Sequence, residues 1–134
     1  MGAWGYGPFE NDDAADWLDE LIEASDIEVL RRALEPRWLD YVYMQVTKGS
    51  VIVAAAEVLA AGLGKGAADL PDDVKRWVRL NARLPYKTLT NVARAGLELV
   101  LGSRSELRSL WSDSGSNQVE WEKGIRELSQ RVGG

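Results

Sequence analysis

The sequence Val51-Ile-Val-Ala-Ala-Ala-Glu-Val-Leu-Ala-Ala-Gly-Leu63 is apolar around nearly the whole circumference of a predicted helix. A helix with this pattern has neighbours on several sides, so we expect it at the centre of the fold. Its alanines allow those neighbours to approach closely. We expect a break at Lys48-Gly49, a cap at Ser50, and a stop at the glycines that end the segment.

The rest of the chain predicts further short helices around this central one. Apolar residues recur at helical spacing in six other segments. The first of these is expected to begin at Asn11 or Asp12, the second to end before Pro36, and the third to start after Pro71. The fourth is expected to span 86–101, the fifth to open at Ser103-Arg-Ser-Glu106 as a capping box, and the sixth to follow Asn117.

Residues 37–47 are ambiguous, because their Tyr and Val residues favour a strand but no partner strand is evident. We expect irregular or helical structure there. The prediction is a single compact all-α domain over residues 1–134, with six to seven short helices around the central apolar helix 51–63.

The composition excludes several chemistries. The chain contains no cysteine and no histidine. Disulfides, thiolate chemistry, imidazole metal sites and the Ser-His-Asp and Cys-His nucleophilic systems are therefore absent. An enzyme built from this chain would have to use carboxylates, Lys, Tyr, Ser or Thr. No cofactor is expected.

The sequence also indicates a compartment. The acidic N-terminus lacks the apolar run of a secretory signal. The longest apolar run, 51–63, has 13 residues, whereas a membrane span needs about 20. The low pI, near 4.8, argues against non-specific nucleic-acid binding. We expect a cytoplasmic protein that binds neither membrane nor nucleic acid, and the sequence leaves its oligomeric state open.

Negative charge is concentrated at the N-terminal end of the chain. Residues 1–30 carry nine acids and no base, and the remaining 104 residues carry 12 acids and 16 bases. On the first predicted helix, acids form a stripe opposite the apolar face. The first of them suit the positive end of the helix dipole, but Glu20 and Glu23 near the helix end oppose it. Helix stability therefore does not explain the whole stripe.

The N-terminal arm, residues 1–10, alternates glycines with Trp4, Tyr6 and Phe9. Glycine permits backbone conformations that other residues avoid, so we do not expect a helix here. One interpretation is an arm that packs its rings onto the domain. The other is a mobile aromatic arm that a partner captures.

Three parts of the chain carry a family resemblance. They are Met1-Gly-Ala-Trp-Gly followed by Gly7-Pro-Phe-Glu-Asn-Asp-Asp-Ala-Ala-Asp-Trp17, then Ala54-Ala-Ala-Glu-Val-Leu-Ala-Ala-Gly-Leu-Gly64, and finally Ser105-Glu-Leu-Arg-Ser-Leu-Trp111 with a further Trp121. This pattern resembles the DUF4259 family of small, mostly bacterial proteins, over nearly the whole chain. Because that name stands for a domain of unknown function, the resemblance implies no activity and assigns no catalytic residue.

The acidic stripe has two interpretations. It is a solvated face that the basic segment 75–94 of the same molecule partly neutralises, or it is a docking surface for a basic protein. Immunity proteins that neutralise cationic toxins are commonly small, acidic and Trp-rich. We therefore predict a non-catalytic, immunity- or regulator-like protein-binding domain. The candidate contact residues are Trp4, Tyr6, Phe9, Asp12, Asp16, Asp19, Glu20 and Glu23.

The alternative function is a carboxylate-based divalent-metal hydrolase of a phosphorylated small molecule. Asp12-Asp-Ala-Ala-Asp16 matches the acidic motif of prenyl synthases, and Glu20-Leu-Ile-Glu23 resembles the first half of an NTP pyrophosphatase site. The second half is missing, because Asp69-Leu-Pro-Asp72 is better explained as helix capping. No metal site is assigned.

Glu57 is the only charged residue in the central apolar helix. A buried carboxylate without a partner is costly, so it must reach solvent, pair with a cation, or titrate at a high pH. We expect either a structural Glu57 bonded to Arg94 or to a Trp indole, or an acid that lines a pocket with Arg94.

Overall fold

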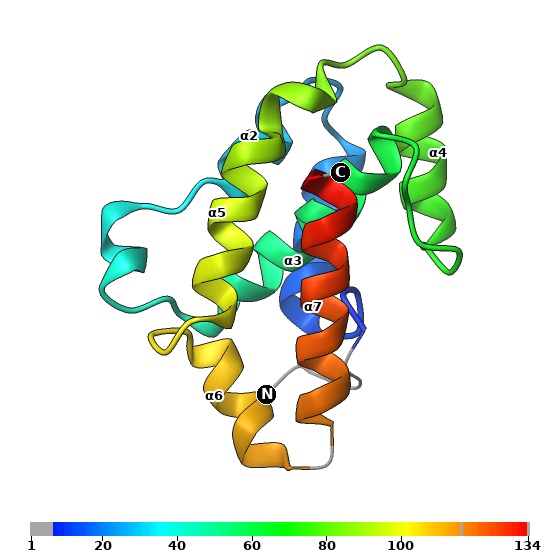
Figure 1. Cartoon of the computed structure of the whole chain (residues 1–134). Helices are drawn as coiled ribbons and strands as arrows, with labels where there is room; N and C mark the ends of the chain where they lie inside the picture. The colour runs from blue at the N-terminus through cyan, green and yellow to red at the C-terminus, as the bar shows by residue number, and fades with distance from the viewer. Residues whose placement is uncertain (1–6, 116, 134) are drawn as a thin grey trace.

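The computed structural model describes residues 7–115 and 117–133 (Figure 1). These residues form seven α-helices, two short 3-10 helices and no β-strand. In chain order the elements are α1 (Asp12–Ile22), α2 (Glu28–Leu34), η1 (Trp38–Tyr41), α3 (Val46–Gly62), α4 (Asp72–Leu80), η2 (Tyr86–Leu89), α5 (Thr90–Leu101), α6 (Glu106–Ser114) and α7 (Gln118–Gly133). The predicted all-α class is confirmed. Within the described ranges, no helix is both long enough and apolar enough to cross a membrane.

Helix α3 is the centre of the fold, with α1, α2, α5 and α7 packed around it (Figure 1). Every residue from 52 to 60 is buried. The position of the central helix was therefore predicted correctly, and the reason is its apolar circumference.

The predicted start of the central helix was wrong. α3 begins at Val46 and runs through Lys48 and Gly49, and Ser50 is a buried helical residue rather than a cap. Gly49 is used here for close packing, because a Cβ on it would lie only 3.3 Å from the Cβ of Leu107 on α6. A glycine inside a helix lowers its intrinsic stability, but here it lets another helix approach.

The first turn of α3 is capped from a distant part of the chain. The Val46 N–H donates to Glu106 Oε1 at 2.7 Å. The predicted capping box at residues 103–106 was therefore wrong, because Glu106 serves another helix. Ser105 is instead the N-cap of α6, and its hydroxyl accepts from the Arg108 N–H at 3.2 Å. Two backbone hydrogen bonds between Met44 and residues 104 and 106, each 2.9 Å, hold the two segments together.

Replacing Glu106 with alanine should destabilise the protein. The Val46 N–H would lose its acceptor, and loss of a helix cap costs about 0.5–2 kcal/mol. Urea unfolding of the variant measures this. The matched control is Glu98→Ala on the exposed side of α5, which should change stability by less than about 0.5 kcal/mol. Equal losses in both variants would show that Glu106 does not act as a cap.

The remaining helices follow the predicted pattern. Asn11 caps α1, and its side-chain oxygen accepts from the Ala14 N–H at 2.8 Å. Helix α2 ends before Pro36, and α4 begins directly after Pro71. The predicted segment 86–101 is divided into η2 and α5. The apolar face of α7 is buried as expected, through Trp121, Ile125, Leu128 and Val132.

Residues 37–45 form a lobe that projects from the helical body (Figure 1). The Arg37 N–H donates to Asp40 Oδ2 at 2.7 Å and starts η1. Within residues 7–115 and 117–133, strand pairing is limited to one isolated bridge between Met44 and Ser105. The lobe is therefore irregular and partly helical, and most of its large apolar side chains are exposed: Trp38, Leu39, Tyr41, Val42 and Tyr43.

Ionisation of Tyr86 should lower the free energy of unfolding of the protein at alkaline pH. Its ring packs against Gly62, and its hydroxyl donates to the Asn81 carbonyl at 2.8 Å. Burial raises the pKa of Tyr86 from 10.0 to about 12. The folded state therefore holds a proton that the unfolded state releases above pH 10, and stability should decline by up to about 1.4 kcal/mol per pH unit between pH 10 and 12. Urea unfolding of wild type and Tyr86→Phe over this range measures the decline, and an equal decline in both would contradict the assignment.

Candidate functional site

The acids of α1 divide into two sets that face different surroundings. Residues seven or eleven positions apart lie on the same side of a helix. Asp12, Asp19 and Glu23 therefore share one side, and Asp16, seven positions before Glu23, lies at its edge. We call the three acids of this side that do not line a cavity, Asp12, Asp19 and Glu23, the outer stripe. The other set, which we call the groove acids, lines a cavity together with Trp17 and consists of Asp13, Asp16 and Glu20. The sequence suggested a single acidic surface, and in the structure one part of that surface lines a cavity while the outer stripe does not.

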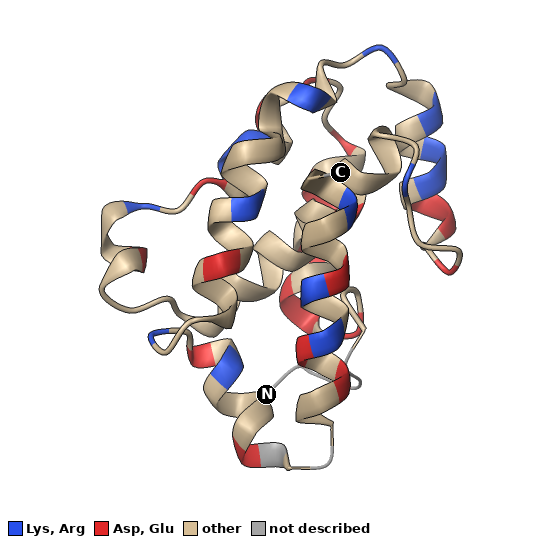
Figure 2. Ribbon diagram, viewed as in Figure 1, with Lys and Arg blue, Asp and Glu red and all other residues tan. Residues whose placement is uncertain are grey.

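The outer stripe is exposed to solvent at all three positions. The ion pairs between described residues use the acids Glu28, Asp40, Glu57, Glu122 and Glu127, and α1 takes part in none of them. Figure 2 marks several Lys and Arg positions along α4 and α5, but among the described residues the segment 75–94 makes no direct ion pair with α1. The stripe thus presents uncompensated negative charge.

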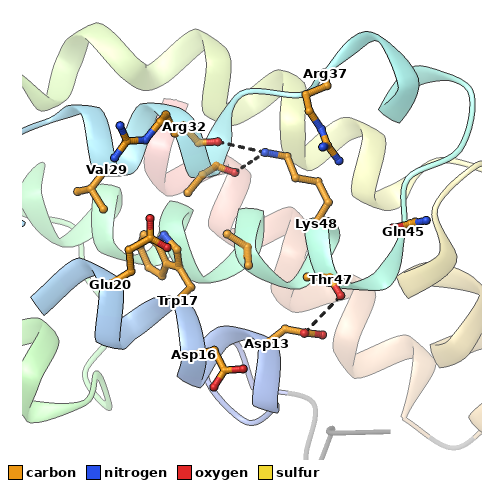
Figure 3. A pocket seen from close by; sticks show the side chains of 12 residues that line it. Asp13, Asp16, Trp17, Glu20, Val29, Arg32, Arg37, Gln45, Thr47 and Lys48 are labelled. Atoms are coloured by element: carbon orange, nitrogen blue, oxygen red, sulfur yellow. Dashed lines mark hydrogen bonds between the residues drawn. The ribbon is translucent and has the colours of Figure 1, made fainter. Parts of the chain in front are cut away.

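A groove of about 500 Å³ separates α1 from α2, the base of the lobe and the first turn of α3 (Figure 3). Its α1 wall carries the three groove acids. The opposite wall carries three bases, Arg32, Arg37 and Lys48. Apolar side chains, including Trp17, Val29 and Val51, line the groove between the two walls. The groove is therefore a dipolar site with charges of opposite sign on facing walls.

Lys48 is fixed in place by the end of α2. Its Nζ donates to the carbonyl oxygens of Arg32 and Ala33, at 3.2 and 3.0 Å. These are carbonyls of the last turn of α2, where the helix dipole favours a cation. Burial lowers the pKa of Lys48, and the carboxylate of Asp40 opposes that shift. The amino group is thus held against the end of α2, at the basic wall of the groove.

Trp17 provides the groove with a donor. Its side chain is 6% exposed, and its indole N–H has no acceptor among the residues that the structure describes. The indole rises from α1 toward α2, into the space between the walls (Figure 3). A nearly buried donor normally has a partner, so this N–H is available to a ligand.

The aromatic arm is only partly described. Phe9 is half-buried and packs against the core, as the packed-arm interpretation expects for this residue. Trp4 and Tyr6 lie outside the described residues.

Glu57 is buried, with 4% of its surface exposed, and its partner differs from the predicted one. Both of its carboxylate oxygens accept from Arg131, at 3.0 and 2.8 Å, rather than from Arg94. Arg94 lies against Gly133 at the end of α7. Glu57 does border a second cavity of about 240 Å³, between residues 7–10 and the loop before α4, and Arg94 is not among the side chains that line it.

The acidic motifs do not converge. Among the described residues, no group of three or more acidic side chains is close enough together to hold a metal ion. Asp72 lies in the first turn of α4, where a negative charge is favoured by the helix dipole.

The comparison with family models agrees with the motifs quoted from the sequence. The model described as domain of unknown function, DUF4259, matches residues 2–124. The chain belongs to the DUF4259 family. Comparison with curated proteins and with solved structures gave no match. DUF4259 membership assigns no activity, so a function for this chain has to be argued from its surfaces.

Sequence reasoning missed the basic wall of the groove and the exposed lobe. Arg32 and Arg37 are close to the acidic helix in sequence, but only the packing of α1 and α2 on α3 brings the two walls face to face. The run of aromatic and apolar residues at 38–43 was a signal for the lobe. Its exposure could not be distinguished from core packing by composition.

Proposed function

We propose that this protein is a non-catalytic protein-binding domain that recognises a basic partner, as an immunity or regulatory protein does. The observation that carries this proposal is the outer stripe: exposed carboxylates with no ion pair among the described residues. Asp16 and Glu20 border the same side of α1, and Trp4 and Tyr6 remain candidate contacts.

Helix stability accounts for only part of the stripe. Asp12 lies in the first turn of α1, where the helix dipole favours it, but Glu23 is the C-cap residue, where the dipole disfavours an acid. Like charges on one side of a helix also repel each other. A cationic partner would remove both penalties, and clustered charge speeds encounter with such a partner by about 10–1,000-fold.

The lobe supports an interface next to this charge. Five large apolar side chains are exposed between residues 38 and 43, and Trp38 is 76% exposed. Single exposed apolar residues are common, but five exposed large apolar side chains among six consecutive positions favour an interaction site. Arg37 and Gln45, at the two ends of the lobe, line the same groove as the α1 acids. The proposed surface therefore combines an apolar, aromatic part with an acidic part, and aromatic residues are enriched at interfaces.

The test is affinity capture from a lysate of the native host with three immobilised proteins. These are the wild type, the outer-stripe variant Asp12→Asn/Asp19→Asn/Glu23→Gln, and the control Glu98→Gln/Asp113→Asn/Glu120→Gln. The control removes the same charge from exposed acids on α5, α6 and α7. We expect a basic protein on the wild type and the control, and none on the stripe variant.

Salt and EDTA distinguish electrostatic binding of a protein from metal-dependent binding. Captured protein should elute at about 0.5 M salt, where the Debye length is well below 10 Å, and EDTA should have no effect. Equal capture by all three proteins would contradict a role for the stripe. Capture that EDTA abolishes would favour the metal-dependent alternative.

A further inference from the structure

We infer that the groove between α1 and the α2–α3 wall binds a small amino-acid-like ligand, which carries cationic groups and one carboxylate. The cationic groups would face Asp13, Asp16 and Glu20, and the carboxylate would face Arg32 and Arg37. This inference goes beyond the proposed function, because it uses the groove rather than the outer stripe.

The α1 wall is suited to a cation. None of its three carboxylates has an ion-pair partner among the described residues, and the one hydrogen bond at this wall joins the Thr47 hydroxyl to Asp13 Oδ1 at 3.3 Å. Asp16 and Glu20 are one turn apart, so an ammonium or guanidinium group can contact both. Hydrogen bonds between ionised groups are about twice as strong as neutral ones.

The opposite wall is suited to a carboxylate. Arg32 and Arg37 are exposed at the groove, and the planar guanidinium matches the geometry of a carboxylate. One nitrogen of Arg37, Nη2, lies 3.6 Å from Asp40 Oδ1, which leaves its other donors available. The amino group of Lys48 is held by the α2 carbonyls, so it acts as a fixed part of the wall.

The charge balance selects a ligand with more positive than negative charge. The carbonyls that hold Lys48 are neutral, so its charge still counts: with Asp40 beside Arg37 included, four carboxylates face three cations, Arg32, Arg37 and Lys48. An amino acid with a cationic side chain has two cationic groups and one carboxylate, and it matches this arrangement. A short peptide with the same groups would match it equally.

The space between the walls fits the body of such a ligand. The volume of about 500 Å³ lies within the range of small-molecule sites, about 300–1,000 Å³. Methylene groups of the ligand can pack on Trp17, Val29 and Val51, and the free indole N–H of Trp17 can donate to a carboxylate or carbonyl oxygen. This donor also gives the site a specific spectroscopic signal.

The experiment follows the Trp17 indole resonance by NMR, assigned with Trp17→Phe, during titration of the full chain. The probes are L-arginine, agmatine, which lacks the carboxylate, and L-citrulline, which lacks the side-chain cation. A lysyl-containing dipeptide distinguishes a free amino acid from a peptide ligand. We expect a saturable shift with arginine or the dipeptide, and binding weaker by about tenfold for agmatine and citrulline.

Single substitutions test the contribution of each wall of the groove to binding. Arg32→Gln should weaken arginine binding by about fivefold or more and leave agmatine binding unchanged, whereas Glu20→Gln should weaken both. Arg126→Gln and Glu122→Gln on α7 are the matched controls and should change nothing. The outer-stripe variant should still bind arginine, which separates this inference from the proposed function. Absence of saturation up to about 20 mM probe, or identical binding of arginine to Arg32→Gln, would overturn it.

Discussion

Replacing Arg131 with methionine should lower the free energy of unfolding by about 3–5 kcal/mol, because it leaves a buried charge without its partner. Arg131 donates from Nη1 and Nη2 to both oxygens of Glu57, and from Nε to Glu127 at 2.7 Å. Its Nη1 also donates to the Lys65 carbonyl at 3.1 Å. The hydrogen bonds to Glu57 raise the pKa of Arg131, so it stays charged. This residue therefore joins the end of α7 to the centre of α3.

Urea unfolding measures this loss, and two further variants identify its cause. Glu127 is more than half exposed, so Glu127→Gln should cost at most about 1 kcal/mol. The double variant Glu57→Met/Arg131→Met replaces the buried pair with apolar side chains of similar length and should recover most of the stability. If the double variant were as unstable as Arg131→Met, the loss would come from packing and not from the unpaired carboxylate.

Truncating Trp77 to alanine should lower the free energy of unfolding by about 3–5 kcal/mol. Trp77 is 4% exposed, and its indole N–H donates to the Ala24 carbonyl at 2.8 Å. The side chain therefore joins α4 to the turn that follows α1. Trp77→Phe removes the hydrogen-bond donor but keeps an aromatic ring. Its loss of stability should be smaller, because most of the apolar burial stays in place.

Trp38 is the matched control for this measurement, because it is 76% exposed on the lobe. Trp38→Ala should change stability by less than about 0.5 kcal/mol. Thermal or urea unfolding of the two alanine variants provides the comparison. A large loss for Trp38→Ala, or a small one for Trp77→Ala, would contradict the packing described for α4 and the lobe.

The extent of the helices could be predicted where local signals and packing agree. Asn11 before an apolar-periodic run correctly indicated the start of α1, and the apolar circumference of residues 52–60 correctly indicated the central helix. The start of α3 could not be predicted, because its cap, Glu106, lies 60 residues away. Glycine weakens helices, so Gly49 predicts a break. Its close packing against Leu107 depends on the tertiary structure and cannot be predicted from the local sequence.

The candidate site was predictable in its charge but not in its geometry. The excess of acids on the first helix follows directly from the sequence, and so does the need of Glu57 for a partner. Which arginine supplies that partner depends on where α7 meets α3, and the answer is Arg131. Similarly, the division of the α1 acids into the outer stripe and the groove acids depends on the placement of α2 and the lobe.

The proposed interface requires that the outer stripe does not serve the fold, and this can be measured without a partner. The free energy of unfolding is compared between wild type and Asp12→Asn/Asp19→Asn/Glu23→Gln at low salt. We predict a value within about 0.5 kcal/mol of wild type, or a higher one. The variant loses the favourable interaction of Asp12 with the helix dipole, but it also loses the unfavourable interaction of Glu23 with that dipole and the repulsion between the carboxylates. A loss of more than about 1 kcal/mol that high salt removes would show that the molecule's own cations use these carboxylates, and would contradict the proposal.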